Sequence, residues 1–164
     1  RQLPCYRGGG DICYAVKGAK RCVAMAVAET APALICLGAE ACISGASGER
    51  TALLEDFFIS SGVVDLQEDE MLTAIKIPSL PPRTQGVHLR HSLRGPLDFA
   101  IAGVAVLLTV DGGVCEDARI SLLGVARTPI RAYKAEGIIR GERIDETLIE
   151  RTAQVASDES YHLA

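Results

Sequence analysis

The chain has 164 residues, of which 48% are hydrophobic and 23% are charged, and its formal net charge is −4. This composition predicts a folded globular protein and excludes a disordered chain or a large multidomain enzyme. The longest apolar run, residues 99–110, is shorter than the roughly 20 residues that cross a bilayer, so we expect no membrane span. The start of the chain also lacks the pattern of a secretory signal peptide, which favours a cytoplasmic location.

Residues 1–24 predict a long irregular loop, because they are rich in glycine, cysteine and basic residues and show neither helical nor strand periodicity. Residues 1–22 contain five basic residues against Asp11 alone, so this segment carries +4 and the remainder −8. No interleaving of basic and aromatic residues follows, so we expect no nucleic-acid partner. The chain does not begin with Met, and we interpret it as a piece of a longer protein whose upstream part is missing.

A short buried helix and a hairpin are predicted next. Thr30 is a candidate N-cap, the residues that follow are apolar on every side, and Gly38 ends the helix. Residues 41–44 and 50–53 flank a Gly-Ala-Ser-Gly turn, a pattern typical of a β-hairpin.

Residues 54–59 predict a helical turn, and residues 70–77 predict a strand that ends at Pro78. The acidic run at residues 68–70 predicts a solvated loop before that strand. Residues 79–83 contain two consecutive prolines, Pro81 and Pro82, and predict a linker, since proline cannot donate to a strand ladder.

We place the domain boundary at this linker, between a first domain over residues 1–80 and a second over residues 84–164. An antiparallel three-stranded meander is expected in the second domain, over residues 85–93, 99–110 and 118–125. Thr128 and Pro129 open a helix that Gly141 closes, and Asp145 caps another. Strands followed by helices predict an α+β fold with the helices on one face of the sheet.

The strongest chemical signal is the spacing of Cys5, Cys13 and Cys22 on the predicted loop. A structural zinc site usually contains a close cysteine pair, which is absent from this set. Wide spacing on a glycine-rich, basic loop fits an anionic [4Fe–4S] cluster, and three unrelated thiols on a flexible loop are the alternative. A fourth thiolate would come from upstream, or from Cys36 or Cys42.

Several further motifs occur in a recognisable order: residues 28–39, residues 48–51, residues 69–78, Arg90-x3-Arg94-x3-Asp98-Phe99-Ala100, and residues 118–132. With them, nearly the whole chain resembles the FAD-binding medium subunit of the xanthine dehydrogenase family of molybdenum hydroxylases. The resemblance implies an α+β chain: the C-terminal part of a PCMH/VAO-type FAD-binding domain, then a CO dehydrogenase flavoprotein C-terminal-like domain.

The resemblance also implies FAD contacts. Glu29 stands where the family often has aspartate, Leu72 matches a leucine that packs on the flavin ring, and Arg90 stands where many members have lysine. We expect Asp98 to turn back toward Arg90 and Arg94 and to hold an arginine in place. The glycine-rich loops that cradle the FAD pyrophosphate in this family lie upstream of this chain.

Within the family, the spacing of Cys5, Cys13 and Cys22 is similar to that in the β subunit of 4-hydroxybenzoyl-CoA reductase, whose inserted loop holds a [4Fe–4S] cluster with a fourth, upstream cysteine. The implied function is electron transfer between FAD and iron–sulfur centres, with an aromatic acyl-CoA as a candidate substrate. The implied partners are a molybdopterin-containing large subunit and a [2Fe–2S] small subunit. The alternative is a non-enzymatic α+β interaction module whose N-terminal loop binds zinc or is flexible.

Overall fold

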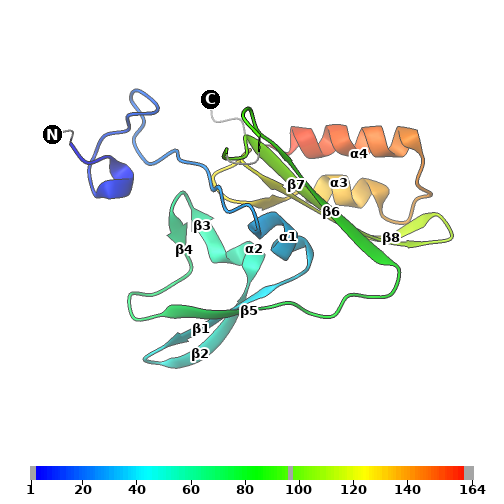
Figure 1. Cartoon of the computed structure of the whole chain (residues 1–164), viewed down its shortest axis with the longest axis horizontal. Helices are drawn as coiled ribbons and strands as arrows, with labels where there is room; N and C mark the ends of the chain where they lie inside the picture. Colours follow the sequence, from blue (N-terminus) through cyan, green and yellow to red (C-terminus); the bar gives the residue numbers. More distant parts are fainter. Residues whose placement is uncertain (1–2, 96–97, 161–164) are drawn as a thin grey trace.

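A computed structural model describes residues 3–95 and 98–160 of the chain. A first sheet has the strand order β2-β1-β5 and a second has the order β6-β7-β8-β9 (Figure 1). The first comprises β1 Glu40–Gly45, β2 Gly48–Leu53 and β5 Met71–Lys76, and the second comprises β6 Thr84–His91, β7 Ala102–Asp111, β8 Val114–Leu123 and β9 Ile130–Arg131. The remaining elements are η1 Tyr6–Gly8, α1 Ala31–Cys36, α2 Leu54–Phe57, the pair β3 Phe58–Ser60 and β4 Val63–Val64, α3 Tyr133–Ile139, and α4 Glu146–Asp158. In these described ranges no helix is long and apolar enough to cross a membrane.

The N-terminal segment confirms the predicted irregular loop: apart from the single turn η1, residues 3–24 form no helix or extended strand in the described part of the chain. This segment extends away from the two sheets (Figure 1). Two tyrosines make hydrogen bonds within this segment: Tyr6 Oη donates to the Ala19 carbonyl over 3.2 Å, and Tyr14 Oη donates to the Leu3 carbonyl over 2.6 Å. The loop therefore has an internal fold of its own, built from local hydrogen bonds.

The first sheet confirms the predicted hairpin and the following strand. Its core lies between the sheet and the short helices and consists of Ile35, Ala39, Ala41, Ile43, Leu54 and Phe57. Strand β5 is the edge of this sheet and is exposed at every position. The predicted side-chain cap at Thr30 is wrong, because no cap bond is made there; instead the Thr30 carbonyl accepts from Leu34 N over 3.1 Å.

The second sheet confirms the predicted meander and adds β9, which pairs with the end of β8. Because residues 130–131 extend the sheet, the helix expected from Thr128 begins only at Tyr133. Asp145 caps α4 as predicted, since its Oδ1 accepts from Leu148 N over 2.7 Å.

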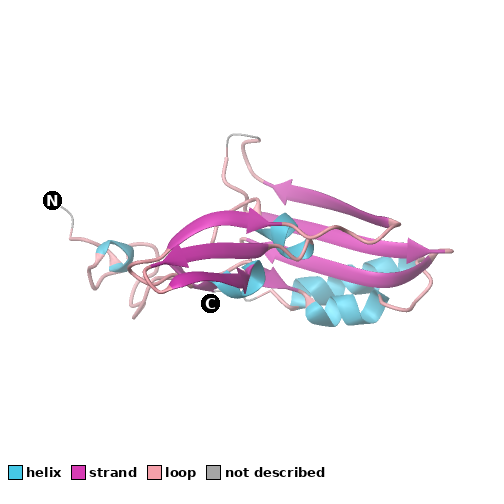
Figure 2. Ribbon diagram, turned by 90° about the horizontal axis from the view of Figure 1, so that it is seen from below, coloured by secondary structure: helices cyan, strands magenta, loops and turns pink. Residues whose placement is uncertain are grey.

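The helices of the second region cover one face of its sheet, as predicted, and a helix of the first region covers the other face. Helices α3 and α4 lie on the face that carries Val104 and Val106. Figure 2 shows both helices on the same side of the strands. Helix α1 packs against the opposite face, where Cys36 contacts Ala105 and Leu107. Successive residues of β7 thus point alternately into two cores, one on each face of the sheet. One of these cores is formed with α1, a helix of the first region.

Candidate functional site

The structure brings two of the predicted FAD residues together. Arg90 on β6 and Glu29, just before α1, form an ion pair with 3.1 Å between Nη2 and Oε1. Glu29 Oε1 also accepts from Ala100 N over 3.3 Å, and Arg90 Nη2 donates to the Asp98 carbonyl. The Arg90 guanidinium is therefore held at a defined place where α1 meets the β6–β7 connection.

Asp98 turns back toward the arginines, as expected. Its carboxylate accepts from Arg94 Nη2 over 3.2 Å and from Arg94 Nε over 3.3 Å. It also accepts from Phe99 N over 3.0 Å. The hydrogen bonds from Arg94 hold the pKa of Asp98 below its usual value. An ionised Asp98 thus fixes the backbone whose carbonyl contacts Arg90.

Leu72, the third predicted FAD residue, lies on β5 of the first sheet, opposite Ile43 of β1. Its side chain is 36% exposed, and its neighbours Met71 and Ile75 are also exposed apolar residues. The structure therefore distributes the predicted FAD residues over both sheets, with a held cation on one and an apolar surface on the other.

The three loop cysteines are free thiols and each is partly buried. Among the described residues, no three His, Cys, Asp or Glu side chains are close enough to hold a metal ion. Cys13 Sγ instead accepts from Val16 N over 3.4 Å, and Cys5 lies in an isolated bridge with Ile12. As arranged here, the thiols do not fit a preformed [4Fe–4S] site.

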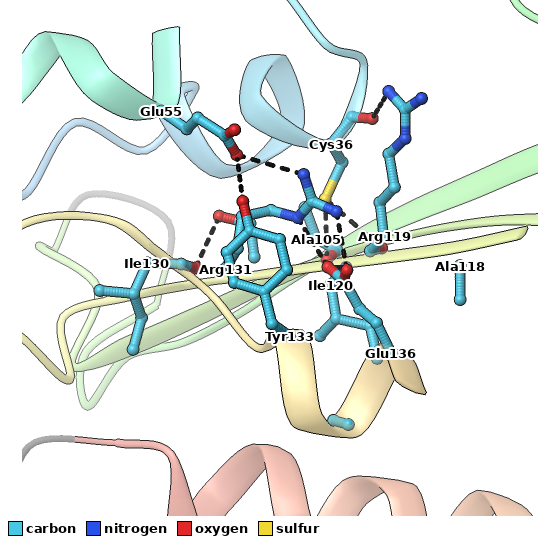
Figure 3. Close-up of polar contacts among 12 residues, drawn as sticks. Cys36, Glu55, Ala105, Ala118, Arg119, Ile120, Ile130, Arg131, Tyr133 and Glu136 are labelled. Carbon is cyan, nitrogen blue, oxygen red and sulfur yellow. Dashed lines mark hydrogen bonds and ion pairs between the residues drawn. The ribbon is translucent and has the colours of Figure 1, made fainter. Parts of the chain in front are cut away.

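Figure 3 shows a polar cluster around Arg131, a residue of the family motif at residues 118–132 whose partners no local pattern indicates. Arg131 of β9 binds Glu136 of α3 through two bonds, Nε–Oε1 at 2.6 Å and Nη2–Oε2 at 2.7 Å. Its remaining Nη1 lies 3.2 Å from Glu55 Oε2 of α2, and Tyr133 Oη donates to the same oxygen over 3.0 Å. This cluster joins α2 of the first region to the second sheet.

A second polar contact joins α1 to the same sheet. Arg119 Nη1 donates to the Cys36 carbonyl at the end of α1 over 3.2 Å. The Cys36 thiol donates to the carbonyls of Ala105 at 3.3 Å and Arg119 at 3.5 Å (Figure 3). Burial raises the pKa of Cys36 to about 11, so the thiol stays protonated at neutral pH.

The acidic run at residues 68–70 lies in a largely exposed loop before β5, as predicted, but two of its carboxylates also bind the hairpin of β1 and β2. Arg50 on β2 binds both oxygens of Glu70, with Nε–Oε1 at 2.7 Å and Nη2–Oε2 at 2.8 Å. Arg50 also donates to the Asp65 carboxylate over 2.7 Å and to the Asp65 carbonyl over 2.8 Å. Asp69 Oδ2 accepts from Ala46 N over 3.3 Å. These partners lie 15 and more residues apart, so no local pattern announces them.

Two family descriptions match consecutive parts of this chain. The FAD binding domain in molybdopterin dehydrogenase matches residues 8–80. The CO dehydrogenase flavoprotein C-terminal domain matches residues 88–161. Together they include Glu29 and Leu72 in the first match and Arg90 in the second.

Individual relatives agree with these matches. The carbon monoxide dehydrogenase medium chain of Afipia carboxidovorans is 35% identical over 126 residues, covering 76% of this chain and 43% of the relative. The xanthine dehydrogenase FAD-binding subunit of Escherichia coli O157:H7 is 28% identical over 129 residues, covering 78% and 41%. The solved carbon monoxide dehydrogenase from Hydrogenophaga pseudoflava superposes with a TM-score of 0.77 at 27% identity, covering 82% of this chain and 46% of that one. This chain thus spans less than half the length of these relatives.

Proposed function

The chain belongs to the family of FAD-binding subunits of xanthine and CO dehydrogenases, and from this membership we propose that it is the FAD-binding, electron-transferring part of a molybdenum hydroxylase complex. The observation that carries the proposal is the succession of the two family matches, at residues 8–80 and 88–161, on a fold shared with a solved relative. The comparisons do not favour a non-enzymatic interaction module. The proposal includes a molybdopterin-containing large subunit and a [2Fe–2S] small subunit as partners, and a cytoplasmic location.

The residues in this chain fit one end of a flavin. Arg90, held by Glu29 and the Asp98 carbonyl, offers a fixed cation with planar donors for a ring carbonyl. Leu72 offers an exposed apolar side chain for a ring face. Bound FAD would supply the redox chemistry, and these residues would orient the ring and tune its electronics. In the proposed site, Glu29 keeps the Arg90 guanidinium from adopting other rotamers.

The experiment is to purify the subunit with its partners and to measure bound flavin and its reduction by substrate. We expect FAD in the parent complex, and slower flavin reduction with less retained FAD in Arg90→Gln. Arg143→Gln is the matched control, since Arg143 is an exposed arginine bonded to the Gly112 carbonyl. A parent complex free of flavin would overturn the proposed function.

A finer part of the proposal concerns Cys5, Cys13 and Cys22 as ligands of a [4Fe–4S] cluster, with an aromatic acyl-CoA as the substrate class. The spacing of the three cysteines and the basic character of the loop support the cluster. The loop would have to rearrange to gather the thiols, because the structure does not group them. Loss of the iron and acid-labile sulfide of one [4Fe–4S] cluster in Cys13→Ser, with the full content kept in Cys115→Ser, would support the cluster. Equal iron in both variants would contradict it.

A further inference from the structure

The segment that leads into β5 is clamped by a single side chain. Arg50 on β2 grips Asp65 and Glu70, which stand at the two ends of the turn over residues 65–70. The Glu70 side chain reaches Arg50 by passing over Gly45, where a Cβ would come within 2.9 Å of Glu70 Cγ. The absence of a side chain at Gly45 therefore makes the clamp possible.

Glu70 also closes the turn itself. Its Oε2 accepts from Gln67 N over 2.8 Å, and its backbone N donates to the Gln67 carbonyl over 3.1 Å. The Glu70 carboxylate thus accepts hydrogen bonds both from the turn, through Gln67 N, and from Arg50. Since Leu72 is only two residues further along, a shift of Glu70 moves Leu72.

The other side of Leu72 is held by a β-bulge. Cys42 of β1 pairs with Ala74 while Ile43 pairs with Leu72, so Thr73 is the extra residue on β5. Thr73 Oγ1 donates to the Cys42 carbonyl over 3.0 Å and so ties the bulged residue to β1. Bulges bend a strand and redirect the neighbouring side chains.

Leu72 is therefore an exposed apolar side chain on an edge strand that is fixed immediately before and after it. An edge strand without such restraints has few contacts to keep its side chains in place. Restraint of this kind is of use for a side chain that must meet a rigid ligand in one orientation.

We propose that Arg50 is a positioning residue for the flavin: it holds Glu70 and Asp65 so that Leu72 is presented to the flavin ring at a fixed place. This inference rests on the proposed function. In the proposed role, Arg50 contacts only protein groups and not the flavin itself. The Thr73 bulge sets the direction of the Leu72 side chain, and the bonds of Arg50 to Glu70 and Asp65 fix the position at which β5 begins.

The test uses the assembled complex with Arg50→Met, Leu72→Ala and the double variant. We expect Arg50→Met to shift the visible absorption bands of the bound flavin and to weaken FAD retention by about tenfold, because a loosened contact must be ordered on binding. Leu72→Ala should act in the same direction, and the double variant should be no worse than the stronger single variant.

The matched control is Arg83→Met, because Arg83 also faces two carboxylates, Asp111 at 3.3 Å and Glu116 at 3.6 Å, on the other sheet. It should leave the flavin spectrum unchanged. A merely structural role of Arg50 would lower thermal stability without moving the flavin bands, and that result would overturn the inference. Additive effects of Arg50→Met and Leu72→Ala would also overturn it.

Two further outcomes separate this inference from the proposed function. A parent complex with FAD in which Leu72→Ala leaves the flavin bands unchanged overturns the positioning role alone, whereas a parent without FAD overturns both. Should Arg50→Met fail to assemble, Arg50→Lys takes its place, since lysine keeps the charge but loses the planar fork. An intermediate band shift in Arg50→Lys supports the inference, and an unchanged spectrum overturns it.

Discussion

The two regions of the molecule contain the same arrangement of charges in different surroundings. In each, an arginine holds a glutamate through two bonds and a second carboxylate through its remaining nitrogen: Arg131 with Glu136 and Glu55, and Arg50 with Glu70 and Asp65. Glu136 is 1% exposed and Arg131 12%, whereas Arg50 is 35% exposed. Because the bond geometry is similar in both clusters, we expect burial to decide how much each contributes to stability. The buried cluster joins the two regions, and the partly exposed cluster holds a turn within the first.

The largest expected effect comes from removing the buried cation. Arg131→Met removes both short ionic contacts of the buried Glu136 and leaves it only Arg140 as an ionic partner, with 4.0 Å between Nη2 and Oε2, so we expect a loss of about 3–5 kcal/mol in the free energy of unfolding. Urea denaturation measures it, with Arg83→Met as the exposed control, for which we expect a change within about 0.5 kcal/mol. A loss below about 1 kcal/mol in Arg131→Met would show that water reaches Glu136.

A smaller loss is expected at the boundary between the regions. Glu55→Gln removes the ionic contact with Arg131 and weakens that with Tyr133, but leaves Arg131 paired with Glu136. We expect the free energy of unfolding to fall by about 1 kcal/mol, the usual contribution of one hydrogen-bonded pair. A double-mutant cycle with Tyr133→Phe checks the assignment, because the two losses should not add if both arise at the Glu55 carboxylate.

The partly exposed cluster of Arg50, Glu70 and Asp65 is expected to respond to acid. The hydrogen bonds from Arg50 lower the pKa of Glu70 from its ordinary 4.5 to about 2. Because the folded pKa is the lower one, the contribution to stability is complete above pH 4.5 and is lost as the pH falls toward 2. NMR titration of the Glu70 carboxyl should give a midpoint near 2 in the parent and a higher one in Arg50→Met. Equal midpoints would remove Arg50 as the cause.

The smallest effect concerns thiol reactivity, where burial again separates two parts of the chain. Burial raises the pKa of Cys36 from 9.0 to about 11, whereas Cys22 lies partly exposed on the N-terminal loop. At pH 8 we expect iodoacetamide to modify Cys22 and to spare Cys36. Since the folded pKa is the higher one, the protonated thiol stabilises the fold fully below pH 9 and less as the pH rises toward 11. Mass spectrometry of the alkylated protein distinguishes the two sites.

Local patterns in the chain were enough for most of the elements. Alternation and a glycine-rich turn predicted the hairpin of β1 and β2, and a turn residue followed by apolar spacing predicted α4 with Asp145 as its cap. The start of α3 was misplaced, because β9 forms only by pairing with β8, a contact that Thr128 and Pro129 do not signal. The face covered by α1 was missed for the same reason.

By itself the sequence determined the family and the order of its two parts, since these depend on motifs read along the chain. Only the tertiary structure decided which charges meet. Arg50 and Glu70 are 20 residues apart, and Arg131 and Glu55 are 76 apart. Such pairs form where the packing of strands and helices brings distant segments together, and the same packing decides whether water or protein surrounds them. For that reason the sequence around an arginine does not distinguish the buried cluster of Arg131 from the partly exposed cluster of Arg50.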